Sequence, residues 1–256
     1  MPGFFSYVIS LTTSDMKKYI YLPLLVLFSL FSLNVHAENI TIAAGAGYKR
    51  PLIEIANQYE KKTGQHIDAV FGHMQQIISQ AKMSGNVSII FGDKTFFDHS
   101  GINFSSYYPV GNGNLVLAWR KGLHIKSIEE IRNKAITRIG IPDANKAVYG
   151  RAATEYLKNA GLSATVAPKI IAVSTVPQVS AYIVSGEIDC GFINITDAIG
   201  IQENIGGYLP ADQSLYTPIL IQGGVVSGFE NRPEVKAFLK FLIDKESVEI
   251  LKHYGL

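Results

Sequence analysis

Residues 40–47 read Ile-Thr-Ile-Ala-Ala-Gly-Ala-Gly, and this stretch decides the fold class. The apolar, β-branched run over residues 40–46 predicts a short strand that breaks at the glycines. Pro51 then stands at a suitable first position for a helix that ends at Gly64. Apolar side chains repeat at helical spacing in between, at Leu52, Ile55, Ala56 and Tyr59. A buried strand that leads directly into a helix indicates an α/β protein.

The same alternation of strand and helix continues along the chain. Further strands are expected at residues 66–71, 87–91, 115–119, 138–142, 169–174 and 190–194, with an extended segment at 216–226. Helices are expected around residues 77–81, from the capping box Ser127-Ile128-Glu129-Glu130, over 152–160, from Pro177 to Gly186, and near Pro233 and Ser247. Strands separated by single helices predict parallel sheets with covered faces and a ligand cleft at the strand ends.

We expect two α/β lobes with a cleft between them. No long linker divides the chain, so the lobes should share short extended connections near residues 114–119 and 216–222, which would act as hinge strands. Residues 38–116 and 218–256 are assigned to the first lobe, and residues 117–217 to the second.

The N-terminal residues 1–37 have the layout of an upstream extension followed by a secretory signal peptide. Lys17 and Lys18 precede an apolar run of about 15 residues, and Val35-His36-Ala37 forms a small-residue cleavage site. The apolar run is shorter than the roughly 20 residues of a membrane span. We therefore expect export to the periplasm and a mature chain that begins at Glu38.

Composition excludes several classes of protein. The net charge of +2 over 256 residues gives no basic stripe for nucleic acid. Cys190 is the one cysteine and lies in an apolar run, where a small buried hydrophobe is expected. The chain carries no G-x-S-x-G or H-E-x-x-H motif and no nucleophile beside a base. We expect neither enzyme activity nor a cofactor.

Four strand-to-helix joints offer backbone N–H groups to a ligand. They are the glycine turn at residues 45–47, and residues 71–74, 143–150 and 174–177. The first joint lacks the third glycine of a dinucleotide fingerprint and the Gly-Lys of a phosphate loop. Helix N-termini carry a partial positive charge, so four of them around one cleft would attract a small anion without any charged side chain.

His73 and Met74 lie at the second of these joints and leave an alternative open. A histidine and a thioether are ligands that suit a transition metal. A metal ion or chelate held near His73 and Met74, with Tyr48 and Tyr149, is therefore the second interpretation of the cleft.

The chain from about residue 40 to 255 resembles the periplasmic molybdate-binding proteins of ABC importers. The resemblance rests on the order and spacing of many short segments. They are residues 42–47 (IAAGAG), 55–64 (IANQYEKKTG), 71–72 (FG), 113–117 (GNLVL), 155–161 (EYLKNAG), 186–187 (GE), 191–193 (GFI), 196–198 (TDA) and 250–255 (ILKHYG).

This resemblance implies a type II periplasmic-binding-protein fold that holds a tetrahedral oxyanion with neutral donors. The serine positions of the family fall at Gly47 and Met74, and its hydroxyl-bearing tyrosine falls at Asn194. Its helix-start alanine falls at Tyr149, and its valine is kept as Val176. Each hydrogen bond lost from a charged ligand costs roughly 1.5–3 kcal/mol, about tenfold or more in affinity. Tyr48, Lys49, Tyr149 and Asn194 are the residues that could compensate.

Together these features predict a solute-binding protein that delivers a small ligand to the membrane permease of an ABC importer. Molybdate or a related oxyanion is the first expectation for the ligand, and a monomer without nucleic-acid partners is the expected state. A metal ion or chelate, a small organic acid, an exported enzyme and a periplasmic sensor are the alternatives. The predicted ligand-binding residues are Gly47, Tyr48, His73, Met74, Tyr149, Val176 and Asn194.

Overall fold

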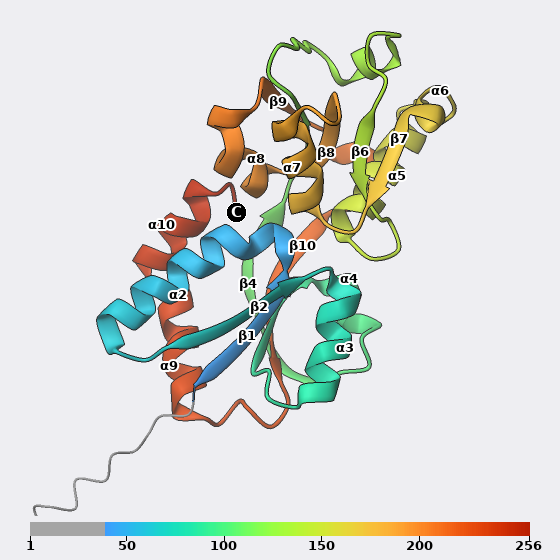
Figure 1. The fold of residues 1–256 in the computed structure, drawn as a ribbon. Helices are drawn as coiled ribbons and strands as arrows, with labels where there is room; N and C mark the ends of the chain where they lie inside the picture. Colours follow the sequence, from blue (N-terminus) through green and yellow to red (C-terminus); the bar gives the residue numbers. More distant parts are fainter. Residues whose placement is uncertain (1–38) are drawn as a thin grey trace, which may run out of the picture. The chain divides into compact units, whose positions relative to one another are not determined.

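The computed structural model describes residues 39–256 (Figure 1). The predicted extension, signal peptide and cleavage site fall on residues 1–38 and lie outside the described residues.

The first of two five-stranded sheets is built around residues 40–45, the first strand predicted from the sequence. Its strand order is β2 (Ile67–Gly72), β1 (Ile40–Gly45), β3 (Ile89–Asp93), β10 (Ile219–Val226) and β4 (Phe104–Gly113). Strand β1 runs parallel to β2 and β3, whereas β10 runs antiparallel to β3 and β4.

Helices cover both faces of this sheet (Figure 1), which is why β1 and β3 are mostly apolar and are buried at every position except Thr41. Side chains alternate between the two faces. Ile42 packs in the same core as Ile55 of α2 (Lys49–Thr63), whereas Ala43 packs with Ile77 of α3 (Met74–Ser84). The other helices of this lobe are α4 (Lys94–Asp98), α9 (Pro233–Leu242) and α10 (Lys245–His253).

The second sheet has the order β7 (Ile170–Val173), β6 (Ile139–Pro142), β8 (Cys190–Asn194), β5 (Leu115–Trp119) and β9 (Gly207–Pro210). Its helices are α5 (Val148–Asn159), α6 (Ser163–Val166), α7 (Val176–Ser185) and α8 (Ile195–Ile201). Short 3₁₀ segments complete the described chain: η1 (Ala46–Tyr48), η2 (Ile128–Arg132), η3 (Ala167–Lys169), η4 (Gln202–Asn204) and η5 (Gln213–Leu215). Cys190 is fully buried here, and burial raises the pKa of its thiol to about 12, so it packs as a hydrophobe as expected.

The chain passes between the sheets twice. It leaves the first sheet at Asn114, between β4 and β5, and returns through residues 211–218, between β9 and β10. Strands β5 and β10 each pair within one sheet only. The connections between the sheets are therefore Asn114 and residues 211–218, and most of each predicted hinge segment lies within a strand of a single sheet.

Three local expectations need correction. Both sheets are mixed rather than parallel, because β10 and β5 return antiparallel to their neighbours. Strand β4 went unpredicted because Pro109 and several glycine and serine residues hide its pattern. Ser127 makes no side-chain capping bond, since Glu130 accepts instead from the backbone N–H of Lys126, and the segment is a 3₁₀ turn.

The predicted helix boundaries are otherwise close. Gly64, Gly85 and Gly186 each end a helix in the left-handed conformation that glycine permits. Helix α5 begins at Val148, four residues before the predicted start at Ala152. Within residues 39–256 no helix combines the length and apolar character needed to cross a membrane.

The capping box at the start of α7 provides a stability prediction. Thr175 accepts the N–H of Gln178, and the side chain of Gln178 accepts the N–H of Thr175 in return. Thr175→Ala should lower the free energy of unfolding by about 1 kcal/mol in urea titrations. Ser127→Ala, at a helix start without such a bond, is the control and should change stability by less than about 0.5 kcal/mol. Equal losses in both variants would contradict the assignment of the cap.

Candidate functional site

Four strand-to-helix turns, two from each lobe, converge on one small cavity. Strands β1 and β2 end there in the first lobe, and β6 and β7 lead into it in the second. The room inside is about 30 Å³. The residues that line it are Gly45, Ala46, Gly47, Tyr48, Gly72, His73, Met74, Ala147, Val148, Tyr149, Thr175 and Val176. The structure thus brings together six of the seven residues predicted from sequence.

Helix starts supply the positive potential of this cavity. Helices α3, α5 and α7 begin at Met74, Val148 and Val176, all of which line it. The first backbone N–H groups of a helix have no partner within the helix and carry part of its dipole charge. The cavity lining within the described chain holds no carboxylate, ammonium or guanidinium group. Its chemistry therefore comes from N–H and O–H donors.

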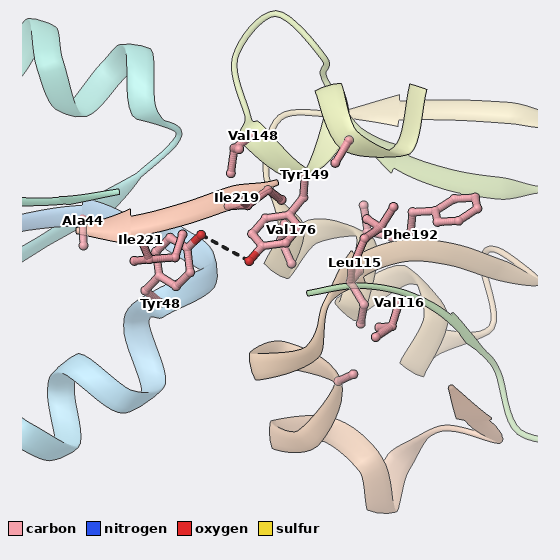
Figure 2. Close-up of a cluster of buried hydrophobic side chains, with 14 of the residues drawn as sticks. Ala44, Tyr48, Leu115, Val116, Val148, Tyr149, Val176, Phe192, Ile219 and Ile221 are labelled. Atoms are coloured by element: carbon pink, nitrogen blue, oxygen red, sulfur yellow. Dashed lines mark hydrogen bonds between the residues drawn. The ribbon is translucent and has the colours of Figure 1, made fainter. Parts of the chain in front are cut away.

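Two tyrosines from opposite lobes meet at the cavity (Figure 2). The Tyr48 hydroxyl donates to the Tyr149 hydroxyl at 3.2 Å, and both side chains are almost fully buried. Burial raises the pKa of each phenol above its ordinary value, so both remain protonated. Gly113 is required beside them, because a Cβ at that position would lie 2.4 Å from the Tyr149 hydroxyl.

Asn194, the seventh predicted residue, lies behind the cavity rather than in its lining. Its side-chain Nδ2 donates to the carbonyl oxygen of Gly47 at 2.9 Å, and its Oδ1 accepts the N–H of Asp197 at 3.3 Å. Asn194 is fully buried and caps α8 while it holds the glycine turn of the other lobe. Both polar groups of the amide are therefore engaged in structure.

His73 and Met74 have structural roles at the start of α3. The Nδ1 atom of His73 accepts the N–H of Gln76 at 3.1 Å and caps the helix, which leaves Nε2 to carry the proton of the neutral ring. Burial, with Lys146 nearby, lowers the pKa of His73 and favours this neutral form. The Met74 side chain is buried and fills the space above Gly92.

The described residues contain no cluster of three or more histidine, cysteine, aspartate or glutamate side chains suited to a metal ion. His73 therefore belongs to no such cluster in that part of the chain. Thr175 lies in the predicted joint at residues 174–177 but was not among the predicted ligand-binding residues, and it lines the cavity.

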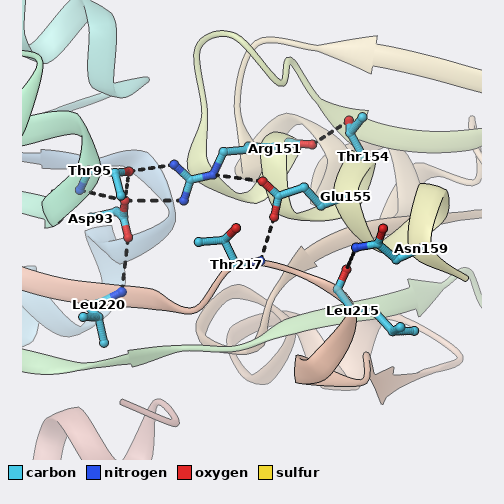
Figure 3. A network of polar contacts seen from close by, with 10 residues as sticks. Asp93, Thr95, Arg151, Thr154, Glu155, Asn159, Leu215, Thr217 and Leu220 are labelled. Atoms are coloured by element: carbon cyan, nitrogen blue, oxygen red, sulfur yellow. Dashed lines mark hydrogen bonds and ion pairs between the residues drawn. The ribbon is translucent and has the colours of Figure 1, made fainter.

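Two arginines cross between the lobes near this cavity. Arg151 of α5 lies 3.5 Å from Asp93 and donates to the Thr95 hydroxyl at 2.6 Å (Figure 3). Arg50 of α2 lies 3.3 Å from Asp197 at the start of α8. Neither pair was predicted from the sequence, because no local pattern relates residues so far apart.

Gly47 and Asn194 are coupled, and this coupling can be tested. A Cβ at Gly47 would lie 2.9 Å from Nδ2 of Asn194. Gly47→Ser alone should therefore lower the free energy of unfolding by about 1–3 kcal/mol, as overpacking does in buried sites. Adding Asn194→Ala should cost less in the Gly47→Ser background than in the wild-type protein, as measured by a double-mutant cycle in urea. Simple additivity would show that the two positions do not compete for space.

Comparisons with known proteins agree with this architecture. The chain is 24% identical over 235 residues to the molybdate-binding protein ModA of Azotobacter vinelandii, covering 88% of this chain and 92% of that protein. The solved structure of the Azotobacter vinelandii periplasmic molybdate-binding protein is similar with a TM-score of 0.77 and 22% identity, covering 85% of this chain and 98% of that one.

A similar fold also occurs in a protein bound to a different ligand. The iron-bound HitA of Pseudomonas aeruginosa matches with a TM-score of 0.61 and 13% identity, covering 83% of each chain. Likeness of fold alone therefore does not select the ligand. Residues 40–256 match the family model of the bacterial extracellular solute-binding proteins. The chain, with its two mixed sheets and the cavity where their turns meet, belongs to this family.

Proposed function

We propose that the protein is located in the periplasm, where it captures molybdate or a related tetrahedral oxyanion between its two lobes. It then delivers the ion to the membrane permease of an ABC importer. The observation that carries this proposal is the convergence of four strand-to-helix turns on one small cavity without charged side chains. We further propose that the protein acts as a monomeric receptor and not as an enzyme.

The size of the cavity favours a compact ligand. About 30 Å³ of room compares with the roughly 10–15 Å³ that one water molecule requires. An ion of a few atoms suits this closed form better than a metal chelate or an organic acid does. A small organic acid and a metal chelate remain as alternative ligands, which the thermal-shift series below tests.

The donors of the cavity favour an anion that is fully ionised. Two hydroxyls joined by one hydrogen bond use one of their two protons, so the pair Tyr48 and Tyr149 retains one proton for a ligand. The helix starts add N–H donors. A protonated anion would need an acceptor for its own proton, and the cavity-lining residues carry no carboxylate to accept it.

The relatives support molybdate as the member of this class to test first. Two curated relatives, from Azotobacter vinelandii and Rhodobacter capsulatus, are named as molybdate-binding proteins. Gly47, Met74 and Asn194 stand where the resembling family has hydroxyl groups. We infer that the hydroxyls of Tyr48 and Tyr149 replace them from the neighbouring positions.

A thermal-shift series tests the proposed ligand. Molybdate should raise the melting temperature of the purified protein, since a ligand that binds only the native state adds about 2.7 kcal/mol at 100 times its Kd. Sulfate and phosphate, copper and iron salts, and small organic acids complete the series. A shift with a metal salt or an organic acid and none with molybdate would reject the oxyanion proposal in favour of that alternative.

The tyrosine pair predicts a specific loss of affinity. Tyr149→Phe should weaken molybdate binding about tenfold in calorimetry, because it removes the one phenolic proton left for a ligand, and a hydrogen bond to a charged group contributes about 1.5–3 kcal/mol. Tyr48→Phe should weaken binding less, because the Tyr48 hydroxyl already donates its proton to Tyr149. Tyr59→Phe is the matched control: its hydroxyl bonds Gln65, outside the cavity lining, and molybdate affinity should stay unchanged. Wild-type affinity in both cavity variants would show that the phenols do not serve the ligand.

A further inference from the structure

Each lobe contributes the same short pattern to the interface, a tyrosine followed two residues later by an arginine. Tyr48 and Arg50 come from the first lobe, and Tyr149 and Arg151 from the second. The tyrosine hydroxyls meet at the cavity, whereas each arginine reaches a buried aspartate of the opposite lobe. The arrangement is thus reciprocal across the cleft.

Each aspartate also has hydrogen-bond partners within its own lobe, besides the arginine of the opposite lobe. Asp93 accepts the backbone N–H groups of Thr95 and Leu220, each at 3.1 Å. Asp197 accepts the hydroxyl of Ser180 from α7. When the lobes separate, each carboxylate keeps partners, and each arginine can move into water. Each pair can therefore open while its carboxylate keeps hydrogen bonds. A buried carboxylate without any partner would be costly.

Gly200 shows that the path of Arg50 is closely fitted. A Cβ at Gly200 in α8 would lie 2.2 Å from Nε and 2.3 Å from Cδ of Arg50. The arginine therefore lies directly against the backbone of this helix on its way to Asp197. Glycine within a helix is less favourable than alanine, and the close approach of Arg50 explains its presence here.

We propose that these two Tyr-x-Arg segments form a reciprocal clasp that holds the lobes closed and slows ligand release. Arg50 and Arg151 are positioning residues, because they act on the closure of the lobes and do not line the cavity. The proposal rests on the proposed function, in which the lobes close on a ligand. Because Arg50 is 43% exposed and Arg151 27% exposed, the clasp weakens as salt screens the two pairs.

The test measures how closed the lobes are in the ligand-free protein, and how fast the bound ion is released. Arg50→Met, Arg151→Met and Gly200→Ala should each increase the radius of gyration of the ligand-free protein in small-angle X-ray scattering. The wild-type protein should expand in the same way at high ionic strength. With molybdate as the probe, each variant should release the ion about three- to fivefold faster in stopped-flow measurements.

Arg120→Met is the matched control. Arg120 pairs with Asp189 at 3.1 Å with similar exposure, 35% and 5%, but both belong to the second lobe. This variant should leave scattering and release unchanged. Gly200→Ala adds a second check, because it leaves Arg50 and Asp197 in place. It should not lower the melting temperature of the protein, since alanine favours a helix more than glycine does.

Two results would overturn the clasp. One is a radius of gyration equal to that of the wild-type protein in both Arg50→Met and Gly200→Ala. The other is an increase in Arg120→Met as large as that in the clasp variants. The scattering measurement needs no ligand, so failure to bind molybdate would reject the proposed function while the clasp could still be judged. Unchanged scattering with intact molybdate binding would reject the clasp alone.

Discussion

The hydrogen bond between the hydroxyls of Tyr48 and Tyr149 joins the two lobes, and it forms only when the turns of both lobes meet closely. Both rings are buried, and both come from turns that follow strands of different sheets. The pair therefore requires that the ends of β1 and β6 face each other with no bulky side chain between them. Gly113 provides that space at the crossing between the sheets, and Gly47 provides it against Asn194. A larger side chain at Gly113 would collide with Tyr149, and one at Gly47 would collide with Asn194.

The site follows a simple electrostatic design. Helices α3, α5 and α7 begin at residues that line one cavity, and two tyrosine hydroxyls lie at the same place. The charged groups lie outside this lining, as ion pairs between the lobes. Neutral donors can bind an anion without drawing a counter-charge into the cavity, while the ion pairs contribute to closure. In the proposed function, binding and closure use separate residues that lie two positions apart in sequence.

The departures from the resembling family have a physical explanation in the structure. Gly47 cannot carry a side chain while Asn194 holds its carbonyl group, so loss of the serine and gain of the amide belong together. Met74 likewise fills the space over Gly92 and contributes to the core of the first lobe. These positions have structural roles here, and the hydroxyl groups that line the cavity belong to Tyr48, Tyr149 and Thr175.

The sequence by itself determined the strand-to-helix rhythm, the helix-ending glycines and the turns that form the site. These features depend on local periodicity and backbone conformation, which neighbouring residues dictate. The mixed direction of the sheets, strand β4, and the pairs Arg50–Asp197 and Arg151–Asp93 were decided only by the tertiary structure. Partners more than 50 residues apart leave no spacing signal, because which atoms meet depends on how the two sheets close on each other.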